Sequence, residues 1–326
     1  FKSDGTTGFG TNGVDIDLQE GGTYVFDWSD STAQGHPIRF SLTNDGTHSS
    51  GTSAGSEYTT GVVKDDSGYK TTITIASGVA NLYYYCQNHS GMGAEVRTNT
   101  THGSTNFDGS LLSVSNANTT AGFSIVTYNI GSSGVKTVGH GLTKAPELII
   151  NKGRDSSSAW WTFTTVIDGT LDYVRLDDTP AKVNDSLLSV PTSSVFSQVE
   201  NYTLQQNVVS YCFHSVEGYS KVGTFVGNGS TDGAFVYTGF RPAWVIIKRS
   251  SSTGSWYILD NKREGLNPDN DELQSDTTQT EQANQRLDLL SNGFKLRQSF
   301  SETNSSSDTF LYMAFAEQSF RYANAR

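Results

Sequence analysis

The feature that most constrains the fold of this chain is an internal duplication in its second half. The segment SIVTYNIGSSGVKTVGHGLTKAPELIINKGRDSSSAWWTF, which begins at Ser124, aligns with KVGTFVGNGSTDGAFVYTGFRPAWVIIKRSSSTGSWYIL, which begins at Lys221. The alignment pairs Pro146 with Pro242, Lys152 with Lys248 and Trp160 with Trp256. A repeat of this kind means that one folding unit is built twice.

The two copies also end alike, because VVSYCFHSVEGYSK aligns with TFLYMAFAEQSFRY. This alignment pairs Tyr211 with Tyr312, Glu217 with Glu317, Tyr219 with Phe320, Cys212 with Met313 and His214 with Phe315. A position that holds different chemistry in two copies is usually a packing position. We therefore expect Cys212 to be a buried, inert thiol. This expectation argues against a disulfide between the two cysteines of the chain.

Short runs of β-branched and aromatic residues fill each copy, and Gly, Asn and Ser turns separate them. This pattern is typical of a β-sandwich. We predict two duplicated, jelly-roll-like sandwich units at residues 119–220 and 221–326. The only helix candidate is the polar stretch Asp271 to Leu290, which is either helical or a loop carrying one short helix.

The first hundred residues predict a further all-β domain, at residues 1–100. Its strand candidates are GTYVFDW (22–28), HPIRFSL (36–42), YKTTITIA (69–76) and NLYYYC (81–86). The following stretch, residues 101–118, is rich in Ser, Thr, Asn and Gly and is predicted to be a linker. The whole chain is thus expected to be all-β.

The loop YYYCQNHSGMG, residues 83–93, gathers three soft metal ligands in a short space. Cys86, His89 and Met92 follow one another at intervals of three residues. A blue-copper centre needs two imidazoles, one thiolate and a weak axial sulfur. His36 is the best candidate for the second imidazole, because it follows a Gly-containing loop and opens a strand. Residues that only fill the core are the alternative to a metal site.

The first domain resembles the cupredoxin family. The phrases GGTYVFDW, GHPIRFS and TTITIASGVANLYYYCQNHSGMGAEVRT carry the resemblance, with a histidine after the second strand and a C-x-x-H loop ahead of the last strand. The resemblance implies a Greek-key sandwich and copper ligands at His36, Cys86, His89 and Met92. The C-x2-H-x2-M spacing is similar to that of the amicyanin type.

Composition and motifs exclude several classes of function. The formal net charge is −11, and no basic stripe offsets it, so no nucleic-acid partner is expected. No run of eighteen apolar residues is present, so no membrane partner is expected. We find no nucleophile elbow and no carboxylate pair with a spacing that assigns acid and base roles, so we expect a protein that is not an enzyme. His48, His102 and His140 lie in Gly/Ser/Thr loops and are expected to be solvated.

The duplicated half is similar to virion structural proteins of marine tailed phages. The phrases GFSIVTY, GHGLTKAPELIINK, SYCFHSVEGYSKVGTFVGNGSTDGAFVYTGFRPAWVIIK and YMAFAEQSFRYANAR carry this resemblance. In such proteins a cupredoxin-like module also occurs ahead of the repeat. The resemblance implies a non-enzymatic component of the virion surface, either a capsid decoration protein or a tail-associated fibre or adhesin. Its partners would be other virion proteins and further copies of itself.

Three tryptophans raise a separate hypothesis about host glycans. Trp160 and Trp161 follow a Ser-rich turn, and Trp256 repeats the first of them. Exposed indole rings would stack on sugar faces, whereas core packing is the alternative. Two other functions therefore stand beside the virion component: a secreted type 1 copper electron-transfer or copper-binding protein, and a carbohydrate-binding adhesin.

Overall fold

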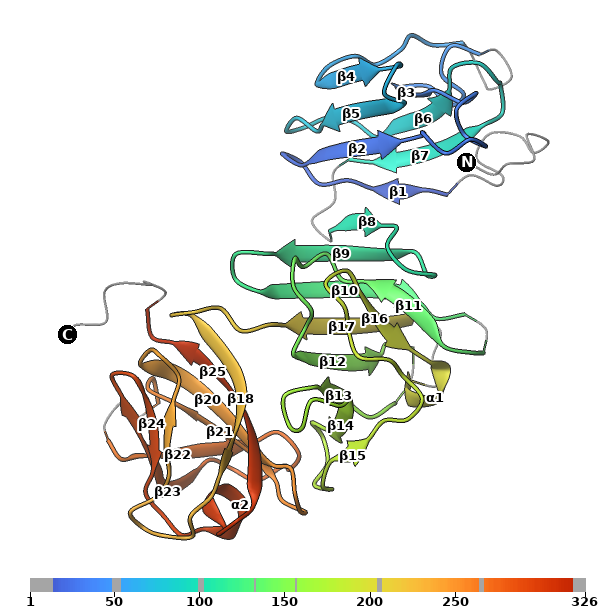
Figure 1. Ribbon diagram of the computed structural model, residues 1–326. Helices are drawn as coiled ribbons and strands as arrows, with labels where there is room; N and C mark the ends of the chain where they lie inside the picture. The colour runs from blue at the N-terminus through green and yellow to red at the C-terminus, as the bar shows by residue number, and fades with distance from the viewer. Residues whose placement is uncertain are drawn as a thin grey trace. The chain divides into compact units, whose positions relative to one another are not determined.

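A computed structural model describes residues 14–48, 54–98, 103–131, 133–155, 157–203, 207–263 and 267–318. With 45% of the residues in strands and 2% in helices, the regular secondary structure is almost all strand, which confirms the predicted all-β fold. The chain forms two compact units, Phe1–Thr105 and Asn106–Arg326 (Figure 1). No helix in the described ranges is long and apolar enough to cross a membrane.

The first unit is a sandwich of two sheets around one apolar core. Its strands are β1 (Ile16–Asp17), β2 (Thr23–Asp27), β3 (Ile38–Ser41), β4 (Val62–Asp65), β5 (Lys70–Thr74), β6 (Leu82–Cys86) and β7 (Gly93–Arg97). One sheet has the order β1-β7-β6-β3 and the other β2-β5-β4. Phe40, Ile73, Leu82 and Val96 are fully buried between them. Burial of such side chains is the main stabilising term for a sandwich of this size.

The register between β3 and β6 positions the predicted ligands. The two strands run antiparallel and pair Ile38 with Cys86. His36 lies two residues before Ile38, so the chain carries it past the end of β6, where Cys86 stands. Residues that are fifty positions apart in the sequence therefore meet at one end of this sheet.

The second unit contains both copies of the repeat. β8 (Ser104–Asn106) spans the boundary between the two units. The first copy holds β9 (Ser113–Asn118), β10 (Phe123–Asn129), β11 (Lys136–Gly139), β12 (Leu148–Gly153), β13 (Trp161–Thr164), β14 (Asp172–Arg175), β15 (Val183–Asn184), β16 (Val195–Gln198), α1 (Glu200–Thr203) and β17 (Asn207–Phe213). The second holds β18 (Ser220–Val226), β19 (Phe235–Tyr237), β20 (Pro242–Arg249), β21 (Trp256–Asp260), β22 (Asp269–Gln274), β23 (Gln282–Leu290), β24 (Gly293–Leu296), α2 (Ser301–Asn304) and β25 (Thr309–Ala316).

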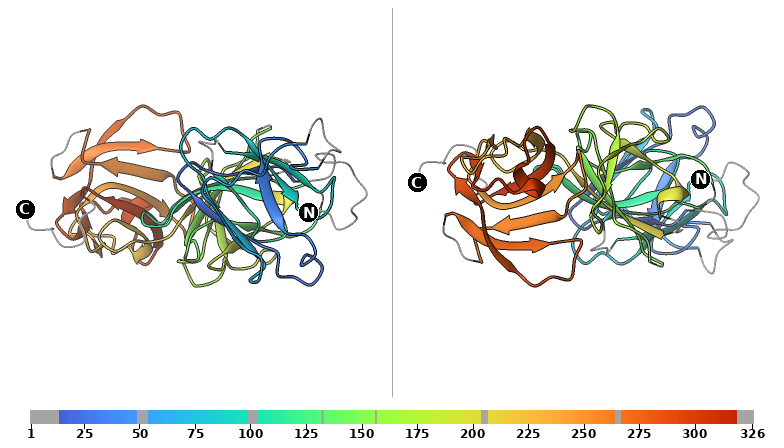
Figure 2. Two further views of the ribbon diagram at one scale, coloured as in Figure 1. Left: turned by 90° about the horizontal axis from the view of Figure 1, so that it is seen from above. Right: turned by 90° about the horizontal axis from the view of Figure 1, so that it is seen from below.

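The sheet orders confirm the duplication. The first copy contains the order β14-β13-β12-β17-β10, and the second contains β22-β21-β20-β25-β18, which are the equivalent strands. In the first copy, β11 and β16 form a separate small sheet. Their counterparts in the second copy are β19 and β24, and β23 connects these two strands to the large sheet. Figure 2 shows the strands of the second copy, coloured orange to red, in two layers.

The strand register corrects the alignment of the two copies at their ends. Val126 in β10 pairs with Ser210, and its equivalent Gly223 in β18 pairs with Tyr312. Ser210 is therefore the counterpart of Tyr312, one residue away from the predicted pairing. Because successive strand residues face opposite sides, this slip changes which residues share a face.

The corrected register still confirms the prediction for Cys212. Its counterpart is Ala314 rather than Met313, and both side chains are fully buried in the cores of their copies. Burial raises the pKa of the Cys212 thiol well above its usual value. Both cysteines are free and buried, so the structure has no disulfide between them.

The predicted linker at residues 101–118 is wrong over most of its length, because β8 and β9 occupy it. β9 forms a hairpin with β10 and pairs from Asn118 opposite Phe123 to Ser113 opposite Tyr128. Backbone ladder bonds hold β9, whose side chains are mostly small and polar. That composition is typical of loops, which is why the sequence indicated a linker.

The helix candidate at Asp271 to Leu290 is also wrong, because β22 and β23 cover most of this stretch. Glu272 and Arg286 face inward and form a bidentate ion pair, with Arg286 Nη2 2.9 Å from Glu272 Oε1. The guanidinium also lies 3.8 Å from the centroid of the Phe300 ring. The pair and the ring hold both charges inside a core, so the sequence shows apolar alternation only at the end of the segment, at Leu287 and Leu289.

The two copies pack against each other through equivalent faces of their large sheets. A cluster of apolar side chains forms this junction, with members Leu148, Val174, Val222, Ile246, Trp256, Leu311 and Met313. Lys248 Nζ adds a polar link, because it donates to the carbonyl of Thr179 at 2.7 Å. The predicted units at 119–220 and 221–326 are therefore two halves of one compact unit.

Candidate metal centre

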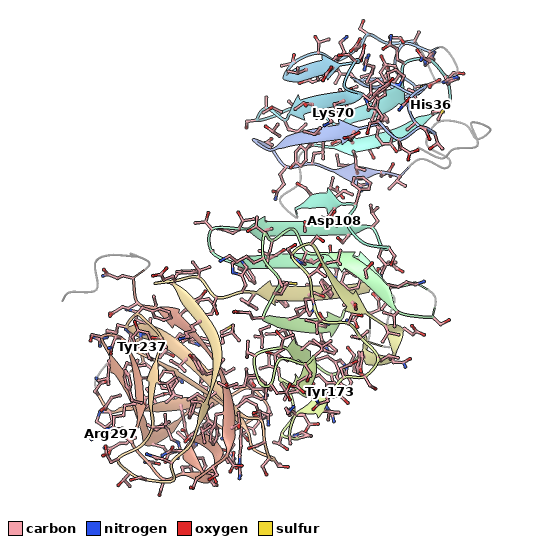
Figure 3. All side chains as sticks on the ribbon, in the orientation of Figure 1. His36, Lys70, Asp108, Tyr173, Tyr237 and Arg297 are labelled. Atoms are coloured by element: carbon pink, nitrogen blue, oxygen red, sulfur yellow. The ribbon has the colours of Figure 1, made fainter. Side chains whose placement is uncertain are left out.

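Three of the predicted ligands, His36, Cys86 and His89, lie together at one end of the first unit. Figure 3 labels His36 in this unit. His36 precedes β3, Cys86 ends β6, and His89 lies in the loop that leads to β7. Cys86 is fully buried, His36 is half-buried and His89 is exposed. The candidate site thus has its thiol in the core and one imidazole at the surface.

The distances among these ligand atoms suit one metal ion. Cys86 Sγ lies 3.6 Å from His36 Nδ1 and 3.4 Å from His89 Nδ1. One candidate ligand atom from each residue lies within 4.8 Å of the other two. Tetrahedral bonds of about 2.3 Å to sulfur and about 2.0 Å to nitrogen separate two ligands by about 3.5 Å. Each imidazole therefore lies from the thiol at the separation expected for two ligands of one soft ion.

Met92, the fourth predicted ligand, is buried in the same loop with 6% of its surface exposed. Its carbonyl accepts a hydrogen bond from the Cys86 N–H at 2.9 Å, which closes the loop onto the end of β6. On the other side of the loop, Gln87 N–H donates to the Pro37 carbonyl at 2.9 Å. These two bonds fix the path of the chain before and after His89.

Burial determines the protonation of the free ligands. It raises the pKa of the Cys86 thiol, although the backbone N–H groups of Asn88 and His89 oppose this rise by bonding to the sulfur. Burial also lowers the pKa of His36, and the neighbouring His89 ring adds to this shift. At neutral pH the site thus favours a thiol and a neutral imidazole, and an ion that binds must displace the thiol proton.

Sequence reasoning missed the residues that support this loop. His48, which we expected to be solvated, is half-buried, and its Nε2 lies 2.9 Å from the Cys86 carbonyl oxygen. Asp45 is fully buried and its Oδ1 accepts the Gly91 N–H at 2.8 Å. The sequence TNDGTH, residues 43–48, reads as an ordinary polar turn, and only the strand register brings it under the ligand loop.

The structure describes one of the two remaining histidines that we expected to be solvated, His140. His140 is fully buried rather than solvated. Its Nδ1 accepts the Leu142 N–H at 3.1 Å, and its Nε2 lies 3.2 Å from the Thr192 carbonyl oxygen. These contacts satisfy both ring nitrogens and give His140 a structural role. His102 lies outside the described residues.

The three tryptophans that we considered for glycan binding lie in the second unit, and they do not form an exposed set. Trp256 is only 2% exposed and its Nε1 donates to the Arg175 carbonyl at 2.7 Å, so it is a core residue and cannot stack on a glycan. Trp160 is half-buried and its ring stacks on Tyr211 at 6.4 Å between centroids. Trp161 packs edge to face against aromatic neighbours. Core packing therefore describes Trp256, and intramolecular contacts occupy the other two.

A shallow hollow of about 650 Å³ lies in the second unit, where the turn after β9, the loop before β12 and the connection from β17 to β18 meet. Its lining includes Thr119, Lys144, His214, Glu217 and Tyr219. Hydroxyl, cationic, anionic and aromatic groups share the surface without a common chemistry, so the lining defines no class of ligand.

The fold and this cluster define a two-unit, all-β protein with a soft-ligand cluster in its first unit. The chain matches a family model described as a domain of unknown function, DUF7483, over residues 37–319, and it belongs to that family. The match includes Cys86, His89 and Met92 and begins one residue after His36. No curated protein and no solved structure matches the chain.

Proposed function

We propose that this protein is a non-enzymatic structural component of a phage particle, and that its first unit binds one copper ion. His36, Cys86, His89 and Met92 would hold the ion. The observation that carries the metal proposal is the approach of both histidine Nδ1 atoms to Cys86 Sγ within 3.6 Å. Thiolate, thioether and imidazole groups together favour copper over harder cations.

Bound copper would supply one-electron redox chemistry. The residues of the chain have distinct parts in holding it. The buried Cys86 provides the thiolate, the half-buried His36 anchors the site to β3, and His89 presents the outer edge of its ring to solvent. Met92, which is buried in the same loop, would supply a thioether as the fourth ligand.

Titration of the full-length protein with copper tests the metal proposal. We expect one equivalent to bind and to produce a visible thiolate-to-copper charge-transfer band. Cys86→Ser should abolish that band, whereas Cys212→Ser, which alters the other buried cysteine, should leave it unchanged. A wild-type protein without the band and without stoichiometric copper would overturn the proposal. Tight zinc binding with no copper preference would do so as well.

The support for a structural, non-enzymatic role comes from the resemblance to phage virion proteins and from how the second unit uses its charges. Perturbed titratable groups often mark active sites. Here the pKa of Asp172 is raised mainly by burial, and Lys182 pairs with it and with Asp168. Arg286 pairs with Glu272 in the core of the second copy. These charged groups pair with one another inside the sandwich and so support a stabilising role.

Mass spectrometry of purified particles tests the virion proposal. We expect this chain in the particle at tens to hundreds of copies, the range of a decoration or fibre protein. Its absence from particles, together with recovery of a copper-loaded soluble form, would replace the proposal with a secreted copper protein. The two experiments are independent, because the copper titration uses the isolated chain.

A further inference from the structure

The turn Thr43–His48 lies against the ligand loop and contacts it at two points. At the first, Asp45 Oδ1 accepts the N–H of Gly91, which lies between His89 and Met92, at 2.8 Å. Asp45 and Gly91 are 46 positions apart in the sequence. The side chain of Asp45 is fully buried, and its Oδ2 has no hydrogen-bond partner among the described residues.

The turn adopts a conformation that aims Asp45 inward. Asp45 and Gly46 have φ values of 59° and 60°, in the left-handed region that few residues adopt readily. The Gly46 N–H donates to the Thr43 carbonyl at 3.2 Å, and the His48 N–H donates to the Asp45 carbonyl at 3.0 Å. A buried carboxylate on a turn that is itself hydrogen-bonded is a rigid acceptor.

The second contact joins the same turn to the metal-ligating cysteine. His48 Nε2 lies 2.9 Å from the carbonyl oxygen of Cys86, and because a carbonyl only accepts, Nε2–H is the donor. The His48 ring also meets the Tyr85 ring edge to face, with 6.0 Å between centroids. The turn thus fixes the ligand loop at its first residue and near its middle.

We propose that Asp45 and His48 are positioning residues, which hold the loop of Cys86, His89 and Met92 in its metal-binding geometry before an ion arrives. The inference rests on the proposed copper function. Groups that orient metal ligands without touching the metal typically change affinity by about 10-fold to 100-fold when they are replaced. Among the described residues, Asp45 Oδ2 has no hydrogen-bond partner and Oδ1 accepts only the Gly91 N–H. Because burying a carboxylate is costly, this single contact to the ligand loop agrees with the positioning role.

The test compares Asp45→Ala, Asp45→Asn and His48→Ala in the full-length protein. Copper affinity is measured by competition with a chelator, and exchange of the Gly91 amide is measured in the metal-free protein. We expect Asp45→Ala and His48→Ala each to weaken copper binding by about 10-fold or more. Asp45→Ala should also speed Gly91 exchange. Asp45→Asn keeps the acceptor oxygen and should restore both properties.

Asp65→Ala is the matched control. Asp65 Oδ1 accepts the Gly68 N–H at 2.8 Å, the same contact at the same distance, but in the turn between β4 and β5. The control should leave copper affinity unchanged. Wild-type affinity and wild-type Gly91 exchange in Asp45→Ala would overturn the inference, and so would an equal loss of affinity in Asp65→Ala.

The exchange measurement separates this inference from the proposed function. If the wild-type protein binds no copper, the proposed function fails, while Gly91 exchange in the metal-free variants still reports whether Asp45 positions the loop. If the wild-type protein binds copper and Asp45→Ala binds it equally well, the positioning role fails and the copper function stands.

Discussion

Phe213 and Phe315 occupy equivalent positions in the two copies of the repeat, and their rings meet edge to face with 6.3 Å between centroids. The equivalence follows from the strand register, which pairs Leu148 with Phe213 and its counterpart Trp244 with Phe315. Both rings belong to the apolar cluster between the copies, so equivalent faces of the two sheets meet at the junction.

This contact predicts energetic coupling between the copies. Phe213→Ala and Phe315→Ala should each lower the free energy of unfolding by about 1–3 kcal/mol, because both rings are half-buried in an apolar junction. The double variant should lose less than the sum, by about 0.5–1.5 kcal/mol. Urea unfolding of the four proteins measures this cycle.

A control cycle uses Phe213 and Phe225. Phe225 contacts other rings inside the second copy, at Phe294, Phe310 and Tyr312. These two substitutions should add without coupling. Additive losses for Phe213 and Phe315 as well would show that the ring contact contributes nothing at the junction.

Substitution by alanine should lower the stability of the protein more at Trp256 than at Trp160. Trp256→Ala should destabilise the protein by about 3–5 kcal/mol, because the indole is buried at the junction and its Nε1 bonds to the Arg175 carbonyl. Trp160→Ala should cost less, because its half-buried ring lies over Tyr211 and beside Lys152. Thermal denaturation compares the two. Equal melting temperatures for both variants would contradict the assignment of Trp256 to the core.

Gly46 predicts a steric requirement beneath the ligand loop. It has a positive φ, and a Cβ at this position would lie 2.4 Å from the buried Tyr85 ring. Gly46→Ala should therefore cost about 2–4 kcal/mol, from the left-handed conformation and from overpacking. Chemical denaturation of the first unit, followed by tyrosine fluorescence, measures the loss.

Gly78→Ala is the control for Gly46→Ala. Gly78 also has a positive φ, of 73°, but a Cβ there would meet nothing within 4 Å. Gly78→Ala should lower the free energy of unfolding by only about 1 kcal/mol, the cost of the left-handed backbone conformation. If both glycine variants lose the same stability, the contact with Tyr85 has no steric role.

Lys248 predicts a pH-dependent contribution to stability. Burial lowers its pKa to about 8, below its ordinary value. Between about pH 8 and about pH 10.4 the unfolded chain binds a proton at this lysine that the folded protein does not bind. The free energy of unfolding should therefore rise with pH across this window, by up to about 3 kcal/mol relative to Lys248→Met.

Urea unfolding at several pH values measures the difference between the wild type and Lys248→Met. Lys144→Met, which removes an exposed lysine of the same unit, corrects for the general loss of one positive charge. A difference that stays constant from pH 7 to pH 10 would contradict the prediction. A difference that decreases as the pH rises would be opposite to the predicted change and would also contradict the prediction.

Local sequence patterns predicted most of the β-architecture and the ligand set. The duplication was visible because Lys152 and Lys248 each donate to the carbonyl six residues later, at Ser158 and Gly254, so the same turn requires the same residues twice. The cysteine and histidines of the candidate site were visible because Cys, Met and His are rare in the chain and three of the four predicted ligands share one loop.

Patterns failed where polar side chains are buried in pairs or where backbone bonds carry a strand. Glu272 and Arg286 are buried as an ion pair, so β22 and the first half of β23 show no apolar alternation. β9 is held by its ladder with β10 rather than by its small polar side chains. Sequence similarity alone also placed the end of the repeat one residue out of register.

The sequence by itself determined that the chain is all-β, that its second half is duplicated, and that a thiol, a thioether and an imidazole share one short loop. Only the tertiary structure decided that His36 reaches that loop and that Asp45 and His48 support it. The physical reason is that strand register, set by packing and backbone hydrogen bonds between distant segments, fixes which side chains meet. Pairing of Ile38 with Cys86 brings the second imidazole to the thiol, whereas the sequence pattern around His36 only made it a candidate ligand.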